Sequence, residues 1–287
     1  MKSLKFLLKV FSFLIFYVFT LDISVASVSD SVKLNYDSAI ISLKEKLNDD
    51  FNYVVYKCFL VVSNLEQNMT SEIVERTMKT VYKSFYNDFF ESEPDELITV
   101  FLFKDDQSYR YWADKLFSDK DVSKFGYYKT SLRTMLMNVG TGLGTLVHEM
   151  THSLVRYDFP DIPAWFNEGL GSLYEQCGIE NGNLKGYVNW RLTELKDAIQ
   201  NNNYLPLKRL VKLDDDMFYE QRSSFNYAQA RYLCYYLQER NLLKLFYKSF
   251  RDNYEYDKTG ESTLVKITGS TIEELDKKFV SFVSQLK

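Results

Sequence analysis

Residues 146–154 read LVHEMTHSL, and the fold predicted for this chain of 287 residues is built around them. His148 and His152 are the two histidines of the chain, and they stand four residues apart with Glu149 between them. On an α-helix, residues i and i+4 lie on one face about 5 to 6 Å apart, so two such imidazoles can bind one metal ion. The adjacent glutamate is turned by about 100° and can reach a metal-bound water without binding the ion. The plainer alternative is a helix whose histidines only complete hydrogen bonds.

A metal site of this kind needs a third protein ligand, and no third histidine exists. Pro163 suits the first turn of a second helix, and Glu168 follows one turn later among apolar neighbours. A carboxylate in such a stretch is costly to bury unless it is paired or binds a metal. Glu168 is therefore the predicted third ligand. Glu175 is the alternative, although its polar neighbours favour a solvated carboxylate.

The chain resembles the gluzincin metallopeptidases, and among them the peptidase-MA-like proteins. The resemblance rests on residues 140–152, which contain the H-E-x-x-H motif, and on residues 163–175, which contain Asn-Glu-Gly, and it extends over about residues 95–240. It implies a two-lobed, zincin-like fold with one zinc ion bound by His148, His152 and Glu168. It also implies peptide-bond hydrolysis with Glu149 as general base.

Tyr227 is a further candidate that comes mainly from the resemblance. It begins a predicted helix, as does the tyrosine of aminopeptidase-like gluzincins whose hydroxyl stabilises the oxyanion. The role is chemically needed, because a second donor must meet part of the developing negative charge. With 22 tyrosines in the chain, a structural tyrosine is the alternative.

Two departures from the family pattern narrow the expected activity. The Gly-x-Met-Glu-Asn stretch with which aminopeptidases bind a free α-amino group has no counterpart, which favours an endopeptidase. Ser172 stands where thermolysin-like members carry an aspartate that orients a histidine, so that partner is left unidentified. Residues 133–139 are expected to form an edge strand beside the motif helix, to which a substrate could add; a covered strand is the alternative.

Helical and strand patterns predict an α+β fold in two lobes. Residues 51–62 and 96–103 are typical of buried strands, and residues 71–86 and 106–117 have helical spacing. Beyond Cys177 the spacing is helical, at residues 184–199, 227–239, 242–254 and 272–286. We therefore predict an α+β lobe over residues 27–178, which holds both the motif helix and the Glu168 helix, and a helical lobe over residues 179–287.

The first 26 residues have the layout of a secretory signal peptide. Three lysines precede an apolar run, and the small residues Ser24, Val25 and Ala26 follow it. The run is shorter than the roughly 18 to 20 residues that cross a bilayer, so a cleaved signal is favoured over an uncleaved membrane anchor. The expected protein is secreted or periplasmic, with no membrane insertion after cleavage.

Charge and cysteine content argue against a nucleic-acid-binding protein and against a cysteine-rich zinc module. The formal net charge is −4, which does not favour binding to nucleic acid. Three cysteines permit at most one disulfide and do not form a cysteine-rich zinc module. The predicted partner is a peptide or unfolded protein substrate. Two alternatives are a zinc-binding domain that binds protein or cell-envelope partners without turnover, and a latent enzyme blocked by the segment before residue 50.

Overall fold

The computed structural model describes residues 35–220 and 223–287. The predicted signal peptide, residues 1–26, lies outside the described residues. The described residues form one compact unit of mixed α and β structure. The predicted α+β class is therefore confirmed, whereas the division near residue 178 and the zincin-like assignment stay predictions.

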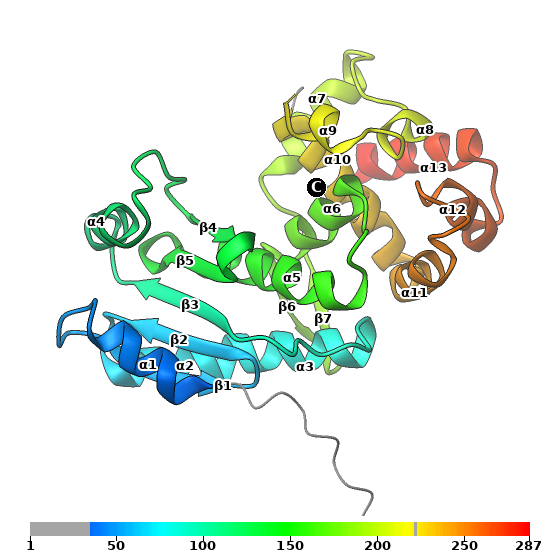
Figure 1. Cartoon of the computed structure of the whole chain (residues 1–287). Coiled ribbons are helices and arrows are strands. Elements are labelled where there is room, and N and C mark those ends of the chain that lie inside the picture. The colour runs from blue at the N-terminus through cyan, green and yellow to red at the C-terminus, as the bar shows by residue number, and fades with distance from the viewer. Residues whose placement is uncertain (1–34, 221–222) are drawn as a thin grey trace, which may run out of the picture. The chain divides into compact units, whose positions relative to one another are not determined.

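A five-stranded mixed sheet forms one end of this unit (Figure 1). Its inner strands are parallel, and an antiparallel strand lies at each edge. The order across the sheet is β1 (Asn52–Tyr56), β2 (Phe59–Ser63), β3 (Ile98–Phe103), β5 (Thr134–Asn138) and β4 (Gly126–Lys129).

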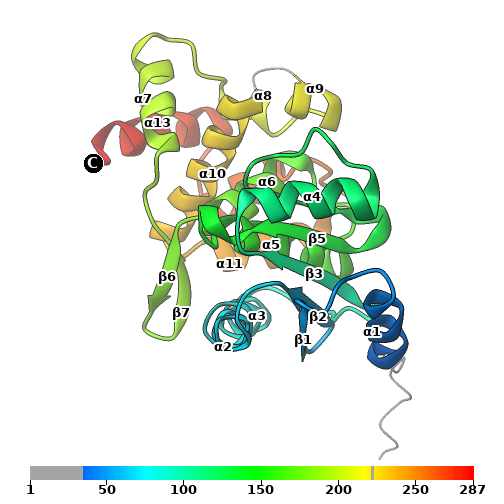
Figure 2. The same ribbon diagram turned by 90° about the vertical axis from the view of Figure 1, so that its left-hand side faces the viewer.

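The inner strands bury both of their faces, because apolar residues occupy odd and even positions alike. In β2, Phe59 and Val61 belong to one core and Leu60 and Val62 to another. The first core continues beneath α3 (Lys79–Asp88), and the second continues beneath α1 (Tyr36–Lys44) and α4 (Asp106–Phe117). Figure 2 shows α1 and α3 on opposite sides of β1 and β2. The sheet is thus the middle layer of three.

Three helices connect this sheet to the helical part of the chain. They are α5 (Gly144–Asp158), α6 (Ala164–Tyr174) and α10 (Ser223–Glu239), and α6 packs against both of the others. Gly169 allows α10 to approach α6 closely, because an added Cβ would lie 2.8 Å from the carbonyl oxygen of Ala230. Trp165, Phe166 and Leu170 on α6 are completely buried. This packing holds α6 against the motif helix α5.

The other elements surround this centre. A π-helical segment joins α2 to α3. The remaining helices and strands are α2 (Gln67–Glu72), β6 (Cys177–Glu180), β7 (Asn183–Gly186), α7 (Arg191–Gln200), α8 (Leu207–Leu210), α9 (Asp215–Glu220), α11 (Leu243–Asn253), α12 (Glu261–Thr268) and α13 (Ile272–Gln285).

Several local predictions were wrong. Residues 51–62 form two strands and not one, because Lys57 has a φ of 52° and reverses the chain between β1 and β2. The helix predicted from residue 184 begins at Arg191, after the β6–β7 hairpin. The predicted edge strand at residues 133–139 corresponds to β5, which lies between β3 and β4; β4 is the edge strand on this side of the sheet.

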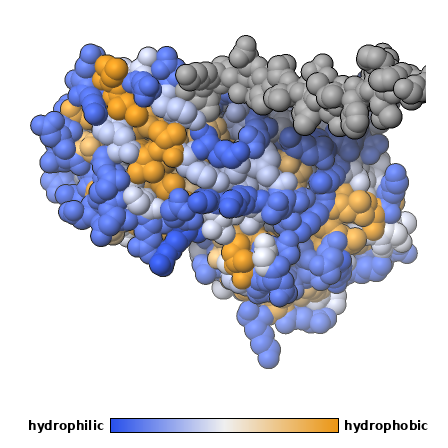
Figure 3. Space-filling view, turned by 90° about the horizontal axis from the view of Figure 1, so that it is seen from below, coloured by the Kyte–Doolittle hydropathy of each residue, from blue (hydrophilic) through white to orange (hydrophobic). Residues whose placement is uncertain are grey.

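The described surface carries dispersed apolar residues. On the face shown in Figure 3, apolar patches are separated by hydrophilic residues. Among the described helices, none combines the length and apolar character needed to cross a bilayer. Cys58, Cys177 and Cys234 are all free thiols.

Candidate metal centre

The structure brings the three predicted ligands together. His148 and His152 lie on one face of α5, and Glu168 comes from α6, which packs against α5. One ligand atom from each residue lies within 4.8 Å of the others. Gly171 permits this approach, since a Cβ at that position would lie 3.2 Å from both imidazole rings.

The three donor atoms converge, and one of them is a buried oxygen without a hydrogen-bond partner. The Nε2 atoms of His148 and His152 are 2.8 Å apart, and Glu168 Oε2 lies 3.2 and 3.3 Å from them. Among the described residues, this buried Oε2 has no hydrogen-bond partner. A buried acceptor without a partner is energetically costly, and a cation at this point would satisfy all three atoms. The donor set therefore fits a metal ion.

Two neighbours contact the imidazole rings at Nδ1. His152 Nδ1 lies 2.9 Å from Asn167 Oδ1, and His148 Nδ1 lies 3.2 Å from Glu175 Oε1. The hydrogen bond to Asn167 favours the His152 tautomer with its proton on Nδ1, which leaves the Nε2 lone pair free for a metal. His148 Nδ1 is within ion-pair distance of Glu175 but makes no hydrogen bond among the described residues. Arg191 in turn donates to both oxygens of Glu175, over distances of 3.2 and 3.0 Å.

Glu175 is therefore not the solvated carboxylate that its neighbours in sequence predict. Its side chain is 11% exposed and lies between His148 and Arg191. Burial opposes its ionisation, but contacts with His148 and Arg191 hold the pKa of Glu175 below its usual value. Glu175 is outside the group of possible ligands and supports His148 instead.

The electrostatic environment favours positive charge at the centre. Burial disfavours the charged form of His148, but the carboxylates of Glu168 and Glu175 outweigh it and raise the pKa of His148 well above its usual value. Burial also opposes ionisation of Glu168, yet the two histidines hold its pKa well below the usual value. This is the charge balance expected where carboxylates surround a cation site.

Glu149 follows His148 on α5 and is partly buried. Burial raises the pKa of Glu149, and the two histidines act in the opposite direction. Glu149 does not belong to the group of possible metal ligands, and its role as general base stays a prediction.

Two tyrosines from the helical part of the chain approach the centre. The ring of Tyr227, on α10, is nearly parallel to that of His148, with an interplanar angle of 12° and 6.5 Å between the centroids. The guanidinium of Arg191 lies 5.4 Å from the Tyr227 centroid. Tyr219, on α9, donates its hydroxyl to Glu168 Oε1 over 2.8 Å. Burial and the charge of Glu168 raise the pKa of both hydroxyls.

The sequence alone does not predict how four residues contact the metal centre: Asn167, Glu175, Arg191 and Tyr219. Glu175 could have been identified from helical spacing, because it follows Glu168 by two turns and so shares its face. Asn167 adjoins Glu168 within the Asn-Glu-Gly motif. Arg191 and Tyr219 come from distant segments, and no local pattern marks them.

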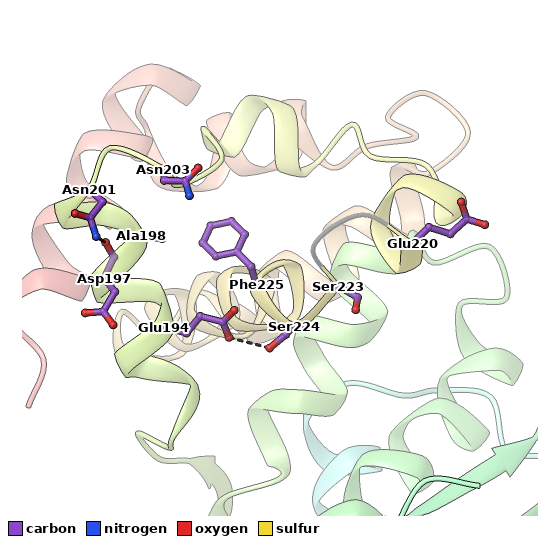
Figure 4. Close-up of a pocket in the computed structure, with 9 residues that line it drawn as sticks. All are labelled: Glu194, Asp197, Ala198, Asn201, Asn203, Glu220, Ser223, Ser224 and Phe225. Carbon is purple, nitrogen blue, oxygen red and sulfur yellow. Dashed lines mark hydrogen bonds between the residues drawn. The ribbon is translucent and has the colours of Figure 1, made fainter. Parts of the chain in front are cut away.

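A separate pocket lies on the helical side, between α7, α9 and α10 (Figure 4). Its volume is about 580 Å³, and three of its lining residues are the acids Glu194, Asp197 and Glu220. Ser224 donates to Glu194 over 2.8 Å. None of the predicted site residues lines this pocket, so it is distinct from the candidate metal centre.

Glu175→Gln is expected to weaken zinc binding by about 10- to 100-fold, because the amide supports the His148 ring less strongly than a carboxylate does. Competition with a chromophoric chelator measures the dissociation constant. Glu180→Gln is the matched control, since Glu180 is exposed and forms an ion pair with Lys185. Equal zinc affinity in both variants would show that Glu175 does not support the site.

No protein-family model matches the chain, and no curated protein matches it. The similarity to gluzincins therefore stays a resemblance of motifs.

Proposed function

We propose that the chain is an exported zinc metallopeptidase of the gluzincin type that acts as an endopeptidase. The observation that carries the proposal is the convergence of His148, His152 and Glu168 beside Glu149, where the buried Glu168 Oε2 has no hydrogen-bond partner among the described residues. Two imidazoles and one carboxylate are the protein ligands of catalytic zinc in peptidases of this type. The signal-like pattern of residues 1–26 supports export.

In this proposal His148, His152 and Glu168 hold the zinc ion. When bound, zinc polarises the scissile carbonyl and lowers the pKa of water to about 7. Glu149 accepts a proton from the attacking water and delivers it to the leaving amine. Asn167 and Glu175 keep the two imidazole rings in the orientation that presents Nε2.

Tyr227 is proposed to stabilise the oxyanion. Its ring lies parallel to that of His148, and Arg191 packs against it, so the side chain is held beside the metal ligands. A preorganised phenol can donate to the oxygen on which negative charge develops.

Strand β4 offers a binding edge for an extended peptide. It pairs with β5 on one side, and in the described part of the chain no strand pairs with its other side. β4 also packs against the motif helix α5, where Arg156 donates to the hydroxyl of Tyr128 over 3.3 Å. A substrate could add to this edge through backbone hydrogen bonds.

Cleavage of a diverse peptide library tests the proposal. The zinc-loaded protein without residues 1–26 is expected to produce new internal termini, which mass spectrometry identifies. Removal of metal with a chelator should abolish cleavage, and added zinc should restore it. Zinc binding without any cleavage would contradict the peptidase proposal and favour a domain that only binds its partners.

A further inference from the structure

We propose that Tyr219 is a positioning residue that holds Glu168 as a one-oxygen metal ligand and leaves oxyanion donation to Tyr227. The inference rests on the part of the proposed function in which His148, His152 and Glu168 bind a metal ion. It concerns a tyrosine that neither the motif nor its spacing identifies.

The geometry divides the two oxygens of Glu168 between two tasks. Oε1 accepts the Tyr219 hydroxyl over 2.8 Å, whereas Oε2 lies 3.2 and 3.3 Å from the histidine Nε2 atoms. Glu168 is 6% exposed, whereas Tyr219 is 42% exposed. A hydrogen bond from a phenol to a buried carboxylate is charge-assisted and fixes its orientation. Tyr219 thereby directs Oε2 at the two imidazoles.

Tyr219 and Tyr227 differ in the contacts that their rings and hydroxyls make. The Tyr227 ring is parallel to the His148 ring and is covered by Arg191, and its hydroxyl also interacts with Glu168. The Tyr219 hydroxyl is committed to Glu168, and its ring packs against Phe218 with 5.5 Å between centroids. The 2.8 Å hydrogen bond to Glu168 comes from Tyr219, whereas Tyr227 lies against the ring of the ligand His148, which favours Tyr227 as the donor for the oxyanion.

The contact also joins α9 to the metal ligand. α9 packs against α6 and α10, and its residue Tyr219 donates a hydrogen bond to Glu168. A metal ion that fixes Glu168 should therefore also order α9. Zinc is expected to slow amide hydrogen exchange in α9, and loss of the Tyr219 hydroxyl should reduce this effect.

The test compares Tyr219→Phe, Tyr227→Phe and Tyr256→Phe in the chain without residues 1–26. Each change removes one hydroxyl and keeps the ring; Tyr256 is 87% exposed and serves as the control. Tyr219→Phe is expected to weaken zinc binding by about 10- to 100-fold, to alter the absorption bands of the cobalt-loaded protein, and to reduce zinc-dependent protection of α9. Tyr227→Phe should lower kcat without changing zinc affinity, and Tyr256→Phe should change neither.

Two outcomes would overturn the inference while leaving the peptidase proposal intact. Equal zinc affinity and an unchanged cobalt spectrum in Tyr219→Phe would show that the hydroxyl does not position Glu168. Unchanged zinc affinity with a loss of kcat would identify Tyr219 as the oxyanion donor. Absence of zinc binding by the parent protein would instead reject the metal centre, and the inference with it.

Discussion

Zinc-loaded Glu149→Gln protein is expected to hydrolyse peptides about 10²- to 10⁴-fold more slowly than the parent and to bind zinc with unchanged affinity. Glutamine has nearly the same shape as glutamate, but its amide cannot accept the proton of the attacking water. Zinc affinity should be retained because Glu149 lies outside the group of possible ligands. Initial rates on one library-derived peptide, together with chelator competition, measure both quantities.

Glu255→Gln is the matched control for this substitution, because Glu255 is exposed. Its rate and zinc affinity should equal those of the parent. A Glu149→Gln protein that cleaves as fast as the parent would exclude Glu149 as the general base. If the parent also fails to cleave although it holds zinc, the alternative of a binding domain without turnover gains support.

The metal ligands could be predicted because their geometry is largely local. A four-residue spacing places His148 and His152 on one helical face whatever the rest of the fold is. Glu168 follows from the need for a third ligand and from its apolar neighbours in sequence. The structure then places the donor atoms of all three within 4.8 Å of one another.

The surroundings of these ligands depend on contacts between distant segments. Arg191 reaches Glu175 from the start of α7, and Tyr219 reaches Glu168 from the short helix α9. Glu175 has polar neighbours in sequence, yet tertiary packing buries it. A charged residue therefore cannot be classed as solvated from its sequence neighbours alone.

The same limit explains the errors in the sheet. Alternating apolar residues identify strands, but pairing order is set by how the whole chain packs. The strand at residues 134–138 is as apolar as an inner strand should be, with Met135, Leu136 and Met137 buried. That pattern favours an inner position over the predicted edge. The β6–β7 hairpin was missed because each of its strands has only four residues, too few for a strand pattern to stand out.

Asp158 anchors the C-terminal end of the motif helix. Its Oδ1 accepts the backbone N–H groups of Glu91 and Ser92 over 2.6 and 2.9 Å. Its Oδ2 accepts the Tyr247 hydroxyl over 2.8 Å and Arg251 Nη1 over 2.9 Å. This carboxylate, whose side chain is 1% exposed, joins α5 to the loop after α3 and to α11.

Asp158→Asn is expected to lower the free energy of unfolding by about 3 kcal/mol. All four partners are hydrogen donors, so the new amide N–H₂ faces donors whichever way it is turned. The change also leaves Arg251 without its buried counter-ion. Urea denaturation of the metal-free protein measures the loss. Asp252→Asn is the matched control, because Asp252 contacts the same arginine but is 60% exposed, and it should cost at most about 1 kcal/mol.

The stability difference between the parent and Asp158→Asn should also depend on pH. Burial opposes ionisation of Asp158, but its four hydrogen bonds prevail and hold its pKa below the usual value. Since the unfolded carboxyl titrates near about 3.9, the unfolded state binds the proton first as pH falls. The contribution of Asp158 is thus fully present well above that pH and is lost as pH falls through the folded pKa. Parent and variant should therefore converge in stability at low pH. A constant difference from about pH 6 to pH 2 would mean that the charge of Asp158 does not stabilise the fold.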